Sequence, residues 1–446
     1  MDALGWRVEG NAGYELPELK LTEPEQELLS ELLDAYEEEA NDAEAALREI
    51  LKAHCEEHRI ILGKESADNI IRAAASNASG YGPFDFMLAD DELEEIAVTG
   101  VGDPVRVFHR SKGWLETNCF ITTMEFALNT TNKMARPLGR RLTLNNPRLN
   151  AVLPCGSRLH ASIHPLALNG VEITLRKFRK KPFTILDLAS NQTISLEAAA
   201  FLWLNLYSDA SLLVAGSTGS GKTTTLNALF SFIPLTDRVV ITEETPEINV
   251  PHGHCVRLIA NEELGITLKE IAKDSLRMRP DRVIIGEVRD EGETRALFDS
   301  MLAGQARGSY ATFHASSAGE AITRLKSLGG REDEVNSIDL ILVQKRFLQY
   351  DAKSRTQREV RRVTEISEVC EGKARALFEY DAKARALEKT RYYSKCDSFK
   401  RLAKNYSFSP SELEAECEKR RRFLEGLNHK DNEEFTREVN AYLFGD

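Results

Sequence analysis

The chain has 446 residues, enough for more than one domain, and its 58 Lys and Arg against 70 Asp and Glu give a net charge of −12. This acidic balance argues against a protein that coats nucleic acid. Its seven cysteines form no C-x-x-C pair, so reduced thiols are favoured over a disulfide framework or a zinc site. The sequence shows no signal peptide and no run of about 18 apolar residues. We therefore expect a cytoplasmic protein that reaches a membrane only peripherally, through a partner.

The first part of the chain predicts two kinds of region. Residues 1–80 are acidic and helical, with a capping box that opens at Thr22 and is followed by leucines at helical spacing. Residues 81–180 alternate turns with short β-like runs such as "PVRVFHR" and "VEITLRKF", and one helix-like run covers 122–134. This mixture predicts a small α+β domain.

The rest of the chain predicts an α/β domain and a tail. The charged stretch "RKFRKKPFT" introduces a hinge linker, which we place at 181–194. Residues 195–345 alternate strand and helix signals, as expected of a domain with a parallel-rich sheet. In 346–446 we expect a hairpin formed by "REVRRVTEISEV" and "KARALFEYD", and then helices, one of them opened by a capping box at Ser409.

A glycine-rich turn near the middle of the chain predicts a phosphate-binding loop. In "SLLVAGSTGSGKTTTLNALF" an apolar strand-like run leads into G-x-x-x-x-G-K-T, and a helix-like run follows. Backbone N–H groups of such a loop converge on an anion, Lys222 would reach the β- and γ-phosphates, and the hydroxyl of Thr223 would ligate Mg²⁺. Because no well-placed N-K-x-D occurs, guanine specificity is unsupported. The predicted nucleotide-binding residues are Gly216, Ser217, Thr218, Gly219, Ser220, Gly221, Lys222, Thr223 and Thr224.

Polar side chains follow the later apolar strands. "DRVVITEE" ends in Glu243 and Glu244, "DRVIIGEVRDEGE" reaches Glu287, and "GSYATFH" ends in His314. Nucleotide hydrolases need carboxylates at the carboxyl ends of neighbouring strands, where one can hold Mg²⁺ and another can orient the attacking water. His314 could donate to the γ-phosphate. The sequence therefore predicts nucleotide hydrolysis.

With these motifs the chain resembles the secretion-superfamily ATPases that power type II and type IV secretion, type IV pilus assembly and the archaeal flagellum. The resemblance rests on "GSTGSGKTTTLNAL", "ITEETPEI", "RMRPDRVIIGEVRDEGET" and "GSYATFHA", which occur in the family's order. Motifs of the first domain match as well, among them "NNPRLNAVLPCGSRLH" and "NGVEITLRKF". The tail "SPSELEAECEKRRRFLEGL" looks most like archaeal members.

The resemblance implies a hexameric ring in which each subunit has a small N-terminal domain and a RecA-like motor domain, with ATP between them. It implies a polytopic inner-membrane platform protein as partner and a pilin-like or secreted substrate that is moved indirectly. No nucleic acid is expected. The alternatives are a nucleic-acid translocase, which would want a basic, aromatic-lined channel, and a scaffold that binds ATP without hydrolysing it.

The resemblance also implies roles for single residues. Glu243 lies where the family has its proposed general base and Glu287 is the Walker B acid, so that either could activate water. His314 would sense the γ-phosphate, and Glu293 would stiffen the site. The implied metal ligands are Thr223, Glu244 and Glu287, although Glu244 stands where the family has Asp.

The first domain carries further implied site residues. Arg148, Arg158 and Arg176 fall where the family's N-terminal domain supplies arginines toward the nucleotide, and structural ion pairs are the alternative. Cys155 replaces the aspartate of the family's "LPDGSR", and we expect a buried structural thiol there.

Overall fold

The computed structural model describes residues 5–16, 21–36, 42–178, 182–261, 264–302, 304, 306–351, 356–428 and 431–442. The chain forms two compact units, Met1–Arg179 and Lys180–Asp446. The boundary falls beside residue 180, where the α+β domain is predicted to end, and the finer division remains a prediction. Residues 179–181, the last of which is the first residue of the predicted hinge, lie outside the described residues.

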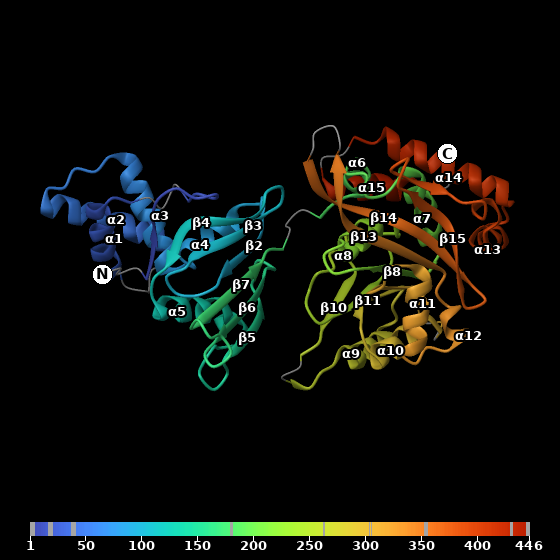
Figure 1. Ribbon diagram of the computed structural model, residues 1–446, viewed down its shortest axis with the longest axis horizontal. Helices are drawn as coiled ribbons and strands as arrows, with labels where there is room; N and C mark the ends of the chain where they lie inside the picture. Colours follow the sequence, from blue (N-terminus) through green and yellow to red (C-terminus); the bar gives the residue numbers. More distant parts are fainter. Residues whose placement is uncertain are drawn as a thin grey trace. The chain divides into compact units, whose positions relative to one another are not determined.

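The first unit joins helices to an antiparallel sheet (Figure 1). Its helices are α1 (Glu23–Asp34), α2 (Ala43–His58), α3 (Lys64–Ala78), α4 (Pro83–Ala89), α5 (Met124–Ala135) and the short η2 (Arg136–Leu138). Its strands are β1 (Trp6–Val8), β2 (Leu93–Val98), β3 (Pro104–His109), β4 (Gly113–Ile121), β5 (Arg148–Val152), β6 (Arg158–Ile163) and β7 (Val171–Arg176), in the spatial order β1-β4-β3-β2-β7-β6-β5.

Local signals explain where these helices begin. The predicted capping box is present at α1, where the carboxylate of Glu25 accepts the backbone N–H of Thr22 at 2.8 Å. The helix predicted around 122–134 is α5, and the hydroxyl of Thr123 accepts the N–H of Phe126 at its start. The apolar faces of α1–α3 and the sheet share one core, to which Leu29, Ile70 and Ile96 contribute.

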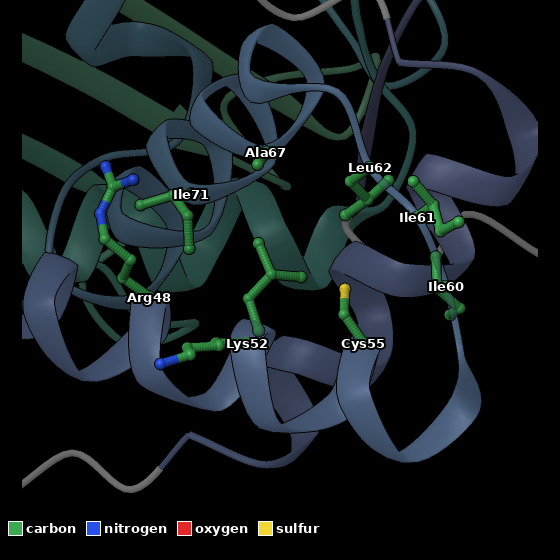
Figure 2. Close-up of a pocket in the computed structure, with 9 residues that line it drawn as sticks. Arg48, Lys52, Cys55, Ile60, Ile61, Leu62, Ala67 and Ile71 are labelled. Carbon is green, nitrogen blue, oxygen red and sulfur yellow. The ribbon is translucent and has the colours of Figure 1, made fainter.

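An apolar pocket of about 390 Å³ lies between α2 and α3 (Figure 2). Figure 2 places Arg48 and Lys52 at one side of this pocket and Ile60 and Ile61 at the other. The guanidinium of Arg48 is occupied, because it donates to Asp68 and Glu44. The pocket is lined by Arg48, Leu51, Lys52, Cys55, Ile60, Ile61, Leu62, Ala67 and Ile71.

The second unit is built on a nine-stranded sheet in the order β10-β9-β11-β12-β8-β13-β14-β15-β16. From β10 to β13 neighbouring strands are parallel, and from β13 to β16 they are antiparallel. The strands are β8 (Leu212–Gly216), β9 (Val239–Glu243), β10 (Cys255–Ile259), β11 (Arg282–Val288), β12 (Gly308–Phe313), β13 (Leu340–Asp351), β14 (Thr356–Cys370), β15 (Lys373–Asp381) and β16 (Ala386–Lys389).

Helices cover both faces of this sheet. Successive side chains of a strand point to opposite faces, and here both sets are apolar and must be buried. On β8, Leu212 and Val214 join one core, whereas Leu213 and Ala215 join the other. The first face carries α6 (Ile185–Ser190), α7 (Leu196–Tyr207), α8 (Lys222–Leu229) with η3 (Phe230–Phe232), η6 (Tyr393–Lys395), α13 (Asp397–Tyr406), α14 (Pro410–Gly426) and α15 (Asn432–Ala441). The second carries α9 (Leu268–Ser275) with η5 (Leu276–Met278), α10 (Glu291–Leu302), α11 (Ala318–Ser327) and α12 (Glu332–Val335) (Figure 1).

Two segments outside the predicted motor region belong to this unit. Helix α6 occupies part of the predicted hinge, because Thr184 and Asp187 form a capping box and Ile185 is buried in the core. The predicted hairpin is formed by β14 and β15, and it extends the motor sheet beyond β13. No helix in the described part of the chain is long and apolar enough to cross a membrane.

Candidate nucleotide site

The predicted phosphate loop connects β8 to α8 at the carboxyl edge of the parallel strands. Gly221, the residue before α8, has φ +93°, a left-handed conformation that favours glycine. At Gly216 a Cβ would lie 2.2 Å from the carbonyl oxygen of Gln344 on the adjacent strand β13. The spacing of these glycines is therefore required by the turn and by a close backbone approach.

Lys222 and Thr223 stand at the start of α8. The ammonium group of Lys222 is buried and donates to the carbonyl oxygens of Gly216 and Ser217 at 3.1 and 3.2 Å. Burial lowers the pKa of Lys222, although Glu287 and Glu247 act in the opposite direction. The hydroxyl of Thr223 donates to Glu247 at 3.1 Å. A cation and a hydroxyl thus occupy the positions at which a phosphate loop holds phosphate and Mg²⁺.

Glu287 and His314 meet at the ends of β11 and β12. The Nε2 atom of His314 lies 2.6 Å from the carboxylate of Glu287. Burial would raise the pKa of Glu287, but Arg289, His314 and Lys222 lower it on balance. Burial and the charge of Lys222 lower the pKa of His314. The pair therefore consists of an ionised carboxylate and a weakly basic imidazole.

Arg289 bridges two carboxylates that belong to different sequence motifs, those of Glu244 and Glu287. Its guanidinium donates from Nε to Glu287 at 2.8 Å and from Nη1 to Glu244 on the stretch after β9. Glu293 accepts the backbone N–H of Arg289 at 2.6 Å, and so holds the peptide that carries this arginine. The guanidinium of Arg289 therefore connects Glu244 and Glu287, and Glu293 contacts the same residue through its backbone.

Glu243 lies at the end of β9 in a different environment. It is 2% exposed, and its Oε1 atom accepts the backbone N–H groups of Glu247 and Ile248, both at 2.8 Å. Its Oε2 atom has no hydrogen-bond partner among the described residues. Burial raises the pKa of Glu243 to about 7, against those two N–H groups. Gly286 leaves room for this side chain, since a Cβ there would lie 3.0 Å from its Cγ.

The donor set near the loop is compatible with Mg²⁺ held together with phosphates. Mg²⁺ is usually bound by one or two carboxylates plus phosphate oxygens and waters, and does not need a cage made by protein alone. The hydroxyl of Thr223 and the carboxylate of Glu247 meet beside the loop. Glu244 and Glu287, the other predicted ligands, share Arg289. Within the described ranges no three His, Cys, Asp or Glu side chains form a metal cage.

The predicted arginines lie in the first unit on one face of its sheet. In the strand register, Arg158 on β6 lies opposite Arg176 on β7, and Arg176 lies opposite Glu95 on β2. Arg148 is on the same face of β5, but its strand partner is Ser162, at the other end of β6. Their neighbours Leu149, Leu159 and Leu175 enter the core. The structure thus brings Arg158 and Arg176 together and sets Arg148 apart.

One expectation from the first domain is wrong. Cys155 is exposed, and its thiol donates to the hydroxyl of Ser157 at 3.3 Å. It lies in the turn between β5 and β6, where its neighbour Pro154 is exposed as well.

Several residues in or around this site were not assigned a role from the sequence. Glu247 and Arg289 lie inside recognised motifs, but the charge pattern alone does not say which partners they take. Gln344 on β13 and Arg361 on β14 reach the loop from the far end of the chain; the Nε atom of Arg361 donates to the carbonyl of Gly219 at 3.0 Å. These contacts depend on β13 lying beside β8, which no local pattern reveals.

A phosphate loop at the carboxyl edge of parallel strands, with acids at the ends of neighbouring strands, defines a RecA-like nucleotide-binding protein. The family model "Type II/IV secretion system protein" matches residues 122–399. The chain belongs to this family.

Its relatives include archaeal and bacterial proteins. The chain is 38% identical over 231 residues to "Uncharacterized protein MJ0781" of Methanocaldococcus jannaschii, a match that covers 49% of this chain and 31% of that protein. It therefore spans less than a third of that relative's length. It is 28% identical to "Type IV secretion system protein VirB11" of Bartonella henselae, over 58% of this chain and 84% of that one. The Legionella pneumophila ATPase DotB is similar over 80% of this chain and 95% of its own, with 17% identity and a TM-score of 0.48.

Proposed function

We propose that the chain hydrolyses ATP with Mg²⁺ and works as a hexameric ring that drives assembly of a type IV pilus-like filament or secretion of protein across a membrane. The observation that carries this proposal is the meeting of Lys222, Glu287 and His314 at one edge of the sheet. Membership of the type II/IV secretion family supports the proposal that ATP hydrolysis is coupled to filament assembly or secretion.

The side chains divide the chemistry between them. Lys222 supplies a point charge to the phosphates, and the loop N–H groups bind their oxygens. Bound Mg²⁺ neutralises charge that develops on the phosphates, and Thr223 with Glu247 would hold it. Glu243 and Glu287 are the candidate carboxylates to orient a water and accept its proton. The raised pKa of Glu243 suits a base at neutral pH, whereas Glu287 is held ionised by Arg289.

The remaining parts of the proposal concern assembly and location. Arginines of the first unit would complete the site in the ring, because a planar, permanently charged fork suits phosphate. The protein would be cytoplasmic and peripheral at the membrane, held there by a polytopic platform protein. A pilin-like or secreted substrate would be moved indirectly.

The test is phosphate release by the purified chain with ATP and Mg²⁺, alone and with DNA. We expect turnover that does not depend on DNA, that rises per subunit with protein concentration, and that accompanies hexamer formation by sedimentation with an ATP analogue. Turnover only with DNA would indicate a translocase. Nucleotide binding without turnover would indicate a scaffold, and a fully active monomer at every concentration would refute the ring.

A further inference from the structure

Gln344 is a buried polar side chain on the strand that borders the phosphate loop. It is 1% exposed, and in the parallel pairing of β13 with β8 it lies opposite Gly216. The pairing of β13 with β14 shifts register between Val343 and Gln344. The unpaired residue of this shift is Thr364 on β14, whereas the pairing of β13 with β8 is unbroken from Leu340 to Gln344. Gln344 therefore follows Leu340 and Leu342 on the same face of β13, at a position where a core strand would carry an apolar residue.

Both ends of this amide are used. Its Nε2 group donates to the carbonyl oxygen of Ser220 at 2.7 Å, and its Oε1 atom accepts the hydroxyl of Thr225 at 2.6 Å. Ser220 and Thr225 are themselves 0% exposed. A carbonyl only accepts, so the amide orientation follows from its partners. Gln344 therefore ties the last peptide of the loop to the helix that follows it.

The bond to Ser220 has a consequence on the other side of the peptide. In a trans peptide the C=O and the N–H point in opposite directions. Since the carbonyl of Ser220 is held toward β13, the N–H of Gly221 is held away from β13. Gly221 also fits closely here, because a Cβ would lie 2.8 Å from the Nε2 atom of Gln344.

We propose that Gln344 is a positioning residue of the phosphate loop, which fixes the Gly221 N–H toward the β-phosphate before nucleotide arrives, with Thr225 holding the amide in place. This inference rests on the proposed function. Preset N–H groups bind an anion without first reorganising. Gln344 should therefore strengthen binding of the phosphates and leave binding of the nucleoside unchanged.

The experiment compares ATP with adenosine as competitors of a fluorescent ADP on the full chain. Gln344→Met keeps the length of the side chain but removes both hydrogen bonds. We expect it to weaken ATP binding about tenfold, the scale of one hydrogen bond to a charged group, and to leave adenosine binding within about twofold. Ser300→Ala, a buried hydroxyl of α10 far along the chain from the loop, is the control for loss of a buried hydrogen bond.

Thr225 provides a second pair of variants in case Gln344→Met does not fold. Thr225→Val keeps the shape of the side chain but removes the hydroxyl that donates to Gln344, and we expect it to weaken ATP binding about threefold. Thr225→Ser keeps the hydroxyl and should bind ATP like the wild type. The positioning role would be overturned by unchanged ATP affinity in Gln344→Met, or by equal losses of ATP and adenosine affinity. Equal ATP affinities of Thr225→Val and Thr225→Ser would also overturn it. A wild-type chain that binds no ATP would instead overturn the proposed function itself.

Discussion

The two ends of strand β11 use charge in opposite ways. At its start, Arg282 is fully buried and donates to Asp237 and Asp209, both at 2.7 Å, and to the hydroxyl of Tyr310 at 3.0 Å. Near its end, Glu287 is partly exposed and is shared between Arg289 and His314. The start is centred on a fully buried cation, whereas the cation and imidazole at the end are partly exposed to a ligand.

The difference teaches where stability and chemistry reside in this unit. A buried ion pair contributes little net stability when intact, but removing one partner is costly because the other charge stays buried. At the carboxyl end of the neighbouring strand β9, Glu243 keeps one oxygen without a hydrogen-bond partner in the described structure. A buried carboxyl group with a raised pKa close to a phosphate loop is typical of a functional site. Changes at the two ends should therefore alter different measurements.

The largest expected effect is at the carboxyl end. Lys222→Ala removes the cation beside the loop carbonyls and should abolish ATP turnover, because no other charge replaces it on the phosphates. Phosphate release is the measurement, and Lys400→Ala, an exposed lysine of α13, is the control. Turnover at the wild-type rate in Lys222→Ala would remove the phosphate-loop assignment.

At the amino end, Arg282→Met should cost about 3 kcal/mol of unfolding free energy, because the carboxylate of Asp237, which is 3% exposed, loses its buried partner. Urea unfolding measures this, and ATP affinity should stay within about twofold. Arg307→Met is a matched control: its side chain is 49% exposed and also contacts Asp237, so we expect less than about 1 kcal/mol. Equal losses in both variants would contradict the role of the buried cation at this end.

His252, near the same end, makes stability depend on pH. It is 5% exposed, lies 3.1 Å from the carbonyl of Pro234, and burial lowers its pKa to about 4. The unfolded chain, with an ordinary pKa near 6.5, binds a proton that the folded chain does not, so stability is lost as pH falls from about 6.5 to about 4. The full gap corresponds to about 3 kcal/mol. Urea midpoints across this range should fall less in His252→Asn, and parallel profiles would contradict the assignment.

A smaller effect is expected where Arg289 bridges Glu244 and Glu287. Arg289→Lys keeps the charge but loses the planar fork that reaches both acids. We expect turnover to fall about tenfold, with an unfolding free energy close to that of the wild type. Arg422→Lys on α14, where the arginine is 73% exposed, is the control. A drop in stability without a drop in turnover would place Arg289 with the structural end.

The positions of the loop, of the strand ends and of several helix starts could be predicted because their signals are local in sequence. The loop motif, the acids at strand ends and the caps at Thr22 and Ser409 each lie within a few residues. What could not be predicted depends on neighbours across the sheet. Gln344 approaches the loop only because β13 pairs with β8, and Arg361 does so only because β14 follows in the same sheet.

The sequence also did not predict which of some side chains are buried or where one short helix forms. The sequence predicts a buried structural thiol at Cys155, where the family has an aspartate, yet this residue is exposed in the turn between β5 and β6. It also predicts a hinge linker over 181–194, of which Ile185–Ser190 form helix α6. Which face of an element meets the core is decided by packing partners far along the chain, as it is for Arg420, which is 1% exposed and lies 4.5 Å from the ring of Trp203.

The most direct test of the contrast along β11 is Glu287→Gln, with ATP affinity and phosphate release measured on the same preparation. The amide keeps the shape of the carboxyl group but cannot accept a proton or stay ionised beside Arg289. We predict that ATP still binds while turnover falls roughly 10²-fold or more. Loss of ATP binding together with a loss of stability like that of Arg282→Met would mean that Glu287 is structural, and that the two ends of the strand do not differ.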